Sequence, residues 1–297
     1  MAKSAKSAKS QKPAATTQTV TPALRQWIID QAEAGFAPDV VLKSMQASGW
    51  TEDVAIEAME TTLAAHLQAT QERKLLPTAV PVPRPALDDA PLLLDAGDRM
   101  VQVLSVMRRP HLVVFGNLLS AEECAELVAL AEPRLSRSLT VETKSGGEEV
   151  HVDRTSDGMF FTRGENPLVQ RIEARIARLL DWPLQNGEGL QVLRYQPGAQ
   201  YKPHYDYFDP QEPGTPTILK RGGQRVATLI MYLGEPEKGG ATIFPDVHLE
   251  VAPQRGNAVF FSYDRPHPST QSLHGGAPVL AGEKWIATKW LREREFN

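Results

Sequence analysis

The sequence predicts a mainly β domain, a sandwich or barrel with helices packed on it, preceded by a small helical module. From Leu190 onward, apolar runs of strand length alternate with glycine and proline turns, a pattern typical of sandwiches and barrels. Residues 20–70 instead place apolar side chains at helical spacing. Residues 71–98 contain five prolines, which favour an extended, semi-rigid linker between the two parts.

Length and charge limit the classes of protein to consider. The chain has 297 residues, with 41% hydrophobic and 23% charged residues, as in soluble globular proteins. A net charge of −4 argues against nucleic acid as the main partner. Because Cys124 is the single cysteine, no intrachain disulfide can form, which favours a reducing compartment and a cytoplasmic location. We expect no membrane span and no secretory signal, since no long apolar run is present.

The first 70 residues divide into a tail and a helical module. Residues 1–19 repeat Ala-Lys-Ser and offer no apolar core, so we expect a disordered tail. Residues 20–70 predict three short helices, the first of which begins with Thr21 as the cap and Pro22 in the first turn. Their order loosely resembles a ubiquitin-associated-type bundle, which implies a docking module. A packed appendage without a partner explains the pattern equally well.

The second domain is expected over residues 99–297. It opens with a strand at residues 111–115, and a capping box of Ser120 and Glu123 then begins a helix whose apolar face includes Cys124. Asn166 and Pro167 begin a further helix. Residues 209–223 break the strand pattern with three prolines and four charges, which predicts a mobile loop beside the site described next.

Two residues in a predicted strand indicate a metal site. His204 and Asp206 are separated by one residue, so a strand presents both on one face. Two histidines and one carboxylate on one face of an octahedron suit non-haem Fe(II) and leave open positions. The third ligand would come from His248, His267 or His274. We favour His274, because the other two read as a strand-surface residue and a residue of a proline-rich loop.

Lys284 adds a second element to this predicted site. Open iron sites of this kind commonly take a 2-oxo acid as co-substrate, and the far carboxylate of such an acid needs a buried cation. Lys284 follows His274 by ten residues, at the start of a predicted strand, and can supply that charge.

Here the sequence resembles the catalytic domain of prolyl 4-hydroxylases, within the 2-oxoglutarate- and Fe(II)-dependent dioxygenases. The resemblance covers roughly residues 110–292. The matching motifs are Glu188-x-Leu190-Gln191-Val192-Leu193-x-Tyr195, Tyr201-x-Pro203-His204-Tyr205-Asp206-Tyr207-Phe208, Arg225-Val226-Ala227-Thr228-Leu229-Ile230-Met231-Tyr232-Leu233, Gly239-Gly240-x-Thr242-x-Phe244-Pro245, Gly256-x-Ala258-x-x-Phe261, Ser272-Leu273-His274, Pro278-Val279 and Gly282-x-Lys284-Trp285.

The resemblance implies a fold, cofactors and roles for individual residues. The fold would be a double-stranded β-helix, the cupin-like jelly roll, with supporting helices. The iron ligands would be His204, Asp206 and His274, and Lys284 would bind the distal carboxylate of 2-oxoglutarate. Tyr195 and Thr242 match positions that hydrogen-bond the same co-substrate, although each also reads as an ordinary strand residue. O2 would be the second co-substrate, and ascorbate a reductant.

The resemblance also implies a substrate, a prolyl residue of a protein or peptide. Tyr201 and Trp290 match aromatic residues that line the proline pocket, and they also read as ordinary core aromatics. The positions that match the family's peptide groove are Arg154, Ser156, Glu188 and Arg225. A free amino acid or another side chain is an alternative substrate. The alternative from another class is a non-catalytic binding or sensor protein on the same fold.

Overall fold

The computed structural model describes residues 18–137, 140–141, 148–149 and 155–297. The chain divides into two units, Met1–Leu76 and Pro77–Asn297. The predicted tail, residues 1–19, lies almost wholly outside the described residues. Among the helices of the described part, none is long and apolar enough to cross a membrane.

The first unit is a bundle of three helices with its own apolar core. They are α1 (Pro22–Glu33), α2 (Pro38–Ala47) and α3 (Glu52–Leu75). The Thr21 hydroxyl accepts a hydrogen bond from the backbone N–H of Leu24, at 3.2 Å, as an N-cap does. Ile28, Met45 and Ala55 are fully or almost fully buried between the helices. The three predicted helices are therefore present, and the last one is longer than expected.

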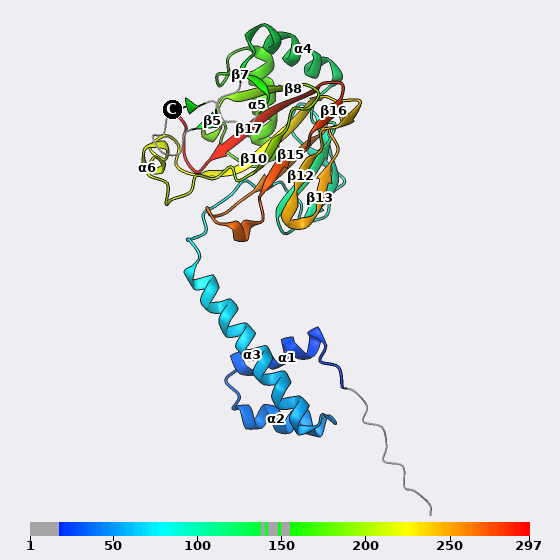
Figure 1. The fold of residues 1–297 in the computed structure, drawn as a ribbon, viewed down its shortest axis with the longest axis vertical. Helices are drawn as coiled ribbons and strands as arrows, with labels where there is room; N and C mark the ends of the chain where they lie inside the picture. The colour runs from blue at the N-terminus through cyan, green and yellow to red at the C-terminus, as the bar shows by residue number, and fades with distance from the viewer. Residues whose placement is uncertain (1–17, 138–139, 142–147, 150–154) are drawn as a thin grey trace, which may run out of the picture. The chain divides into compact units, whose positions relative to one another are not determined.

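The second unit is organised around a large antiparallel sheet. Its strand order is β1-β2-β3-β14-β10-β17-β8-β7-β4, and β8, β10 and β17 lie side by side at its centre (Figure 1). The bounds are β1 (Leu93–Asp95), β2 (Met100–Met107), β3 (His111–Gly116), β4 (Ser136–Arg137), β7 (Asp157–Phe161), β8 (Leu190–Tyr195), β10 (Arg225–Gly234), β14 (Ala258–Ser262) and β17 (Lys284–Arg292).

A smaller antiparallel sheet faces it, with strand order β13-β12-β15-β9. Its bounds are β9 (Tyr201–His204), β12 (Thr242–Phe244), β13 (Leu249–Val251) and β15 (His274–Gly276). From β8 to β17 the chain crosses repeatedly between the two sheets, with β12 and β13 consecutive in the smaller one. This crossing between two facing antiparallel sheets is the topology of a double-stranded β-helix, and it confirms the predicted fold class. Two short pairs complete the strands, β5 (Thr140–Val141) with β6 (Glu148–Glu149) and β11 (Lys238–Gly239) with β16 (Val279–Ala281).

Two helices cover the outer face of the large sheet, α4 (Ala121–Ala131) and α5 (Pro167–Leu179) (Figure 1). The predicted capping box is present, since Ser120 and Glu123 each accept the other's backbone N–H. One buried cluster joins these helices to the outer face, and another fills the space between the sheets. Cys124 belongs to the first cluster, where burial raises the pKa of its thiol to about 11, so it is a core residue.

The proline-rich linker is shorter than predicted, and the predicted loop at residues 209–223 is partly helical. Helix α3 continues to Leu75, and β1 already pairs with β2 at residues 93–95, ahead of the expected domain start at residue 99. Between them, the backbone N–H of Val80 donates to the Asp264 carbonyl at 2.8 Å. The proline-rich stretch is thus hydrogen-bonded to the second unit. Likewise, the loop 209–223 contains a helical turn, α6 (Thr215–Ile218), whose Thr215 is buried.

Candidate active site

The two sheets bring three potential metal ligands together. His204 ends β9, Asp206 follows it, and His274 begins β15 directly opposite His204 in the strand register. Nε2 of His204 lies 3.6 Å from Oδ1 of Asp206, and Nε2 of His274 lies 3.4 Å from Oδ2. One ligand atom from each residue lies within 4.8 Å of the others. Within the described part of the chain, no other group of His, Cys, Asp and Glu meets this criterion.

The hydrogen bonds of the two imidazoles leave Nε2 available for a metal. Nδ1 of His204 lies 2.8 Å from the Lys202 carbonyl, and Nδ1 of His274 lies 3.0 Å from the Ser272 carbonyl. A carbonyl only accepts, so Nδ1 carries the proton in each ring and Nε2 presents a lone pair to the cluster. The strand geometry thereby sets the tautomer, as outer hydrogen bonds do for metal-binding histidines.

The charge states of this cluster suit a divalent cation. Burial, together with His274, lowers the pKa of His204, which favours the neutral imidazole. Burial alone would raise the pKa of Asp206, but His274 and His204 hold it well below its ordinary value, so the carboxylate is ionised. Two imidazoles and one carboxylate, with one ligand atom of each within 4.8 Å of the others, form the donor set that fits Fe(II) with open positions.

A cavity of about 420 Å³ adjoins the ligands. It is lined by residues of both sheets, and most of the residues predicted for the site are among them. The lining residues are Leu193, Tyr195, Tyr201, His204, Asp206, Thr228, Ile230, Thr242, His274, Gly275, Gly276, Lys284, Ile286, Thr288 and Trp290.

Lys284 is the buried cation of this cavity. It begins β17, opposite Tyr195 of β8, and its side chain is 3% exposed. Nζ lies 5.5 Å from the Tyr195 ring centroid, and no carboxylate of the described residues forms an ion pair with it. Burial lowers its pKa to about 8. A buried ammonium without a counter-ion is costly, and an anionic ligand would supply that counter-ion.

Thr242 and Tyr195 are placed to assist the same ligand. The Tyr232 hydroxyl donates to Oγ1 of Thr242 at 2.8 Å, deep in the core. Because that oxygen accepts from Tyr232, the Thr242 proton can be donated to a ligand in the cavity. Both Thr242 and Tyr195 line the cavity with Lys284. This combination of one ammonium and neighbouring hydroxyls suits a carboxylate.

Two aromatic residues lie on the walls of the cavity. The Tyr201 ring stacks on His204, with centroids 3.7 Å apart and an interplanar angle of 27°. Trp290 is 8% exposed, and its Nε1–H has no hydrogen-bond partner in the described structure. The cavity therefore offers flat apolar surface beside the potential metal ligands.

The residues predicted for the peptide groove, as far as the structure describes them, do not line the cavity. Arg225 and Glu188 are not part of the cavity lining, because they form a buried ion pair at 2.7 Å behind Trp290. Arg292 also lies 2.7 Å from Glu188. Ser156 is fully buried, and Arg154 lies outside the described residues. The ion pair therefore supports the wall of the cavity, since burial requires charged groups to pair with one another.

The alternative histidines lie away from the cluster. His248 caps a 3₁₀ turn in a left-handed conformation, and Nδ1 of His267 accepts a hydrogen bond from the Ser269 N–H at 3.1 Å. Sequence reasoning missed Thr228, which donates a hydrogen bond to Asp206, and Tyr263, whose hydroxyl is hydrogen-bonded to Thr228. Thr228 reads as an ordinary strand residue, and the contact arises only when β10 pairs with its neighbours.

Comparison with known proteins agrees with this geometry. Residues 190–292 match the family model of the 2OG-Fe(II) oxygenase superfamily. Prolyl 4-hydroxylase 5 of Arabidopsis thaliana is 42% identical over 222 residues, which cover 68% of this chain and 74% of the relative. Prolyl 4-hydroxylase 1 of the same plant is 43% identical over 230 residues, covering 72% and 79%. A crystal structure of the viral collagen prolyl hydroxylase of Paramecium bursaria Chlorella virus-1, a 2OG complex, is 30% identical with a TM-score of 0.48, covering 61% and 95%.

Proposed function

Since this chain belongs to the prolyl 4-hydroxylase family of 2OG-Fe(II) oxygenases, we propose that it hydroxylates a prolyl residue of a protein or peptide. The observation that carries the proposal is the cavity in which His204, Asp206 and His274 meet the buried Lys284. A group of three metal-binding residues alone would suit many reactions. A buried ammonium that forms no ion pair with the described residues is the partner that a dicarboxylic co-substrate requires.

Each part of the cavity has a role in this reaction. His204, Asp206 and His274 hold iron on one side of the cavity, and Lys284 with Thr242 binds the distal carboxylate of 2-oxoglutarate. When bound, iron, 2-oxoglutarate and O2 supply the oxidising chemistry that yields succinate, CO2 and a hydroxylated carbon. The contribution of the chain is to orient the co-substrate, exclude water and place the target C–H beside the iron position.

The walls of the cavity favour a proline ring as the substrate group. Tyr201 and Trp290 offer flat apolar surface beside the metal ligands. Proline is apolar, rigid and favours an extended chain, so aromatic walls suit it.

The experiment that tests this function is hydroxylation of synthetic peptides. The purified protein, Fe(II), 2-oxoglutarate and ascorbate would be incubated with extended proline-containing peptides and with matched peptides in which alanine replaces proline. We expect one added oxygen on proline by mass spectrometry, with an equal amount of succinate, and no added oxygen with the His274→Ala variant. Oxygen found only on free amino acids or on other side chains would contradict the proposal.

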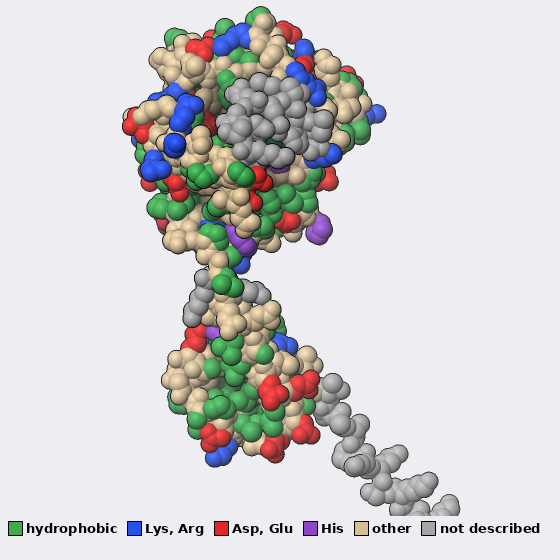
Figure 2. Space-filling model, turned by 60° about the vertical axis from the view of Figure 1, so that its left-hand side comes forward, with side chains coloured by type: hydrophobic (Ala, Val, Ile, Leu, Met, Phe, Trp, Pro, Cys, Tyr) green, Lys and Arg blue, Asp and Glu red, His purple; other side chains and the backbone are tan. Residues whose placement is uncertain are grey.

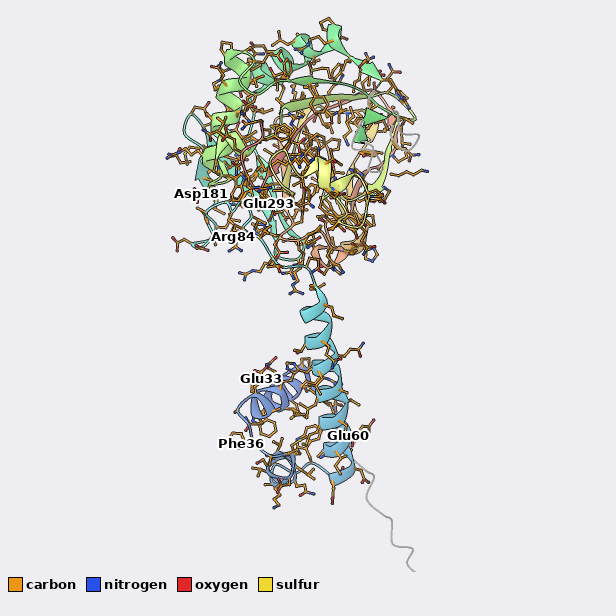
Figure 3. The ribbon with its side chains drawn as sticks, turned by 90° about the vertical axis from the view of Figure 1, so that its left-hand side faces the viewer. Glu33, Phe36, Glu60, Arg84, Asp181 and Glu293 are labelled. Carbon is orange, nitrogen blue, oxygen red and sulfur yellow. The ribbon has the colours of Figure 1, made fainter. Side chains whose placement is uncertain are left out.

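We propose, further, that the first unit docks a protein partner. Its own apolar core is closed, yet Phe36 is 52% exposed and Val40 is 45% exposed. Figure 2 shows hydrophobic side chains gathered on one face of this unit with acidic side chains around them, and Figure 3 shows Phe36 in the turn between α1 and α2. Exposed apolar surface of this kind is typical of interaction sites.

We also propose a cytoplasmic location for the protein. The support for this proposal is the single cysteine.

A further inference from the structure

We propose that Thr228 and Tyr263 are positioning residues that hold the Asp206 carboxylate in the orientation the metal requires. Thr228 lies in β10 of the large sheet, and Tyr263 follows β14. Oγ1 of Thr228 donates to Oδ2 of Asp206 at 2.7 Å and lies 2.9 Å from the Tyr263 hydroxyl. The inference rests on the iron site of the proposed function and extends it to residues that do not bind the metal.

The direction of each hydrogen bond follows from the chemistry of the groups. Thr228 donates its single hydroxyl proton to Oδ2 of Asp206, so that proton is used in this bond. The Thr228 oxygen must then accept from the Tyr263 hydroxyl. Tyr263 keeps its proton, because burial and the nearby Asp206 raise its pKa well above the ordinary value. The three groups therefore form a directed relay from Tyr263 through Thr228 to Asp206.

The relay is anchored by buried backbone. Thr228 is fully buried, and its strand pairs with β14 on one side and β17 on the other. Tyr263 is 1% exposed, and its backbone N–H donates to the Val226 carbonyl at 2.9 Å. Because both donors are fixed by the large sheet, the position of Oδ2 is fixed as well. Asp206 itself lies after the end of β9, where the small sheet no longer holds it.

Such an anchor matters because the carboxylate torsion is soft. The terminal torsion of aspartate is broad and roughly two-fold, so an unrestrained group would sample both oxygens. With Oδ2 bound to Thr228, Oδ1 is left to the metal, 3.6 Å from Nε2 of His204. Ligation through one oxygen keeps more coordination positions open for the co-substrates than ligation through two. Hydrogen bonds of this outer kind change metal affinity by about 10- to 100-fold.

Two matched variants of Thr228 test the inference on the full-length protein. Thr228→Val replaces the hydroxyl with a methyl group of similar size, and Thr228→Ser keeps the hydroxyl. Affinity for Co(II), a spectroscopic substitute for Fe(II), would be measured on metal-free protein by titration of the visible absorption bands. We expect affinity about 10- to 100-fold weaker for the valine variant, with altered bands, and near-normal affinity for the serine variant.

A second pair of variants distinguishes loss of the hydrogen bond from Tyr263 to Thr228 from a general effect on packing. Tyr263→Phe removes the donor to Thr228, and Tyr207→Phe is its control, because the Tyr207 ring lies 6.2 Å from Tyr263 and its hydroxyl is not part of the relay. We expect weaker Co(II) binding for Tyr263→Phe alone. If Thr228→Val does not fold, the comparison of Tyr263→Phe with Tyr207→Phe still tests the inference.

The outcomes are distinct from those of the hydroxylation assay, since metal binding is measured without substrate. Normal Co(II) affinity and spectra in both Thr228→Val and Tyr263→Phe would overturn the inference. Equal weakening in the valine and serine variants would overturn it too, because loss of packing and not of the hydroxyl would then be the cause. The proposed function could still hold in either case.

Discussion

The guanidinium carbon of Arg225 lies 4.0 Å from the ring centroid of Trp290, on the side of the indole that faces the core. Glu188 binds that guanidinium through both carboxylate oxygens, at 2.7 and 2.9 Å. Trp290 is thus held between the cavity and a buried ion pair. A bidentate pair fixes the plane of the guanidinium, and the stacked indole follows that plane.

The first prediction concerns this support. Glu188→Gln would leave Arg225 and Arg292 buried without their carboxylate. Breaking a buried pair in this way costs about 3–5 kcal/mol, so we expect a corresponding fall in the free energy of unfolding in urea. The control is Asp95→Asn, whose ion pair with Arg178 is largely exposed and should contribute little. Equal stability of the Glu188 and Asp95 variants would contradict the supporting role.

The meeting of His204 with Asp206 could be predicted from local spacing, while the ion pair behind Trp290 could not. His204 and Asp206 are close in sequence, so strand geometry brings them together without further information. Lys284 could be identified because it begins a clear strand after His274. The pairing of Arg225 with Glu188 depends on the register of β10 and β17 and on a bridge at Gly187, which no short pattern in the sequence encodes.

The boundaries of the second unit were also hidden from sequence reasoning. Five prolines predict an extended segment, but they do not indicate whether that segment is hydrogen-bonded to the rest of the chain. Hydrogen bonds from Val80 and Arg84 to the second unit involve the backbone, so side-chain composition carries no sign of them. Strand β1 is short and lies at the sheet edge, where the periodic signal is weakest.

The second prediction concerns the three ligands. His204→Ala and His274→Ala should each lose most iron binding and all hydroxylation, because two remaining ligands hold the metal weakly. His267→Ala is the control, since His267 caps a turn away from the cluster. Iron content after loading and desalting provides the measurement. Loss of iron in the His267 variant, with iron retained in the His274 variant, would show that the third ligand is misassigned.

The third prediction concerns Lys284. Lys284→Met keeps the length of the side chain and removes the charge, which should cost about 2–3 kcal/mol of co-substrate binding. That energy corresponds to a Kd for 2-oxoglutarate about 30- to 100-fold higher. Calorimetric titration of the metal-loaded protein measures it. An unchanged Kd would contradict the role proposed for Lys284.

The fourth prediction is the pH dependence of the same site. Because burial lowers the pKa of Lys284 to about 8, the free protein loses this positive charge as the pH rises through that value. Binding of 2-oxoglutarate should therefore weaken above pH 8 in the wild-type protein. In the Lys284→Met variant no such change is expected, so the two Kd values should converge at high pH. Parallel curves for both proteins would assign the pH dependence to another group.

The last prediction is that the first unit is not required for catalysis by the second unit. A chain that begins at Pro77 should keep turnover of 2-oxoglutarate and of short peptides, because the second unit has its own core. A chain that begins at residue 97 would lose β1 and the segment that donates from Val80 and Arg84, and should be less stable. Thermal unfolding and succinate release, measured on both truncated proteins and the full-length protein, provide the comparison. An inactive but folded and iron-loaded chain from Pro77 would show that the three helices contribute to the site. With the docking role proposed for those helices, the chain from Pro77 should lose activity toward the whole protein substrate while keeping it toward peptides.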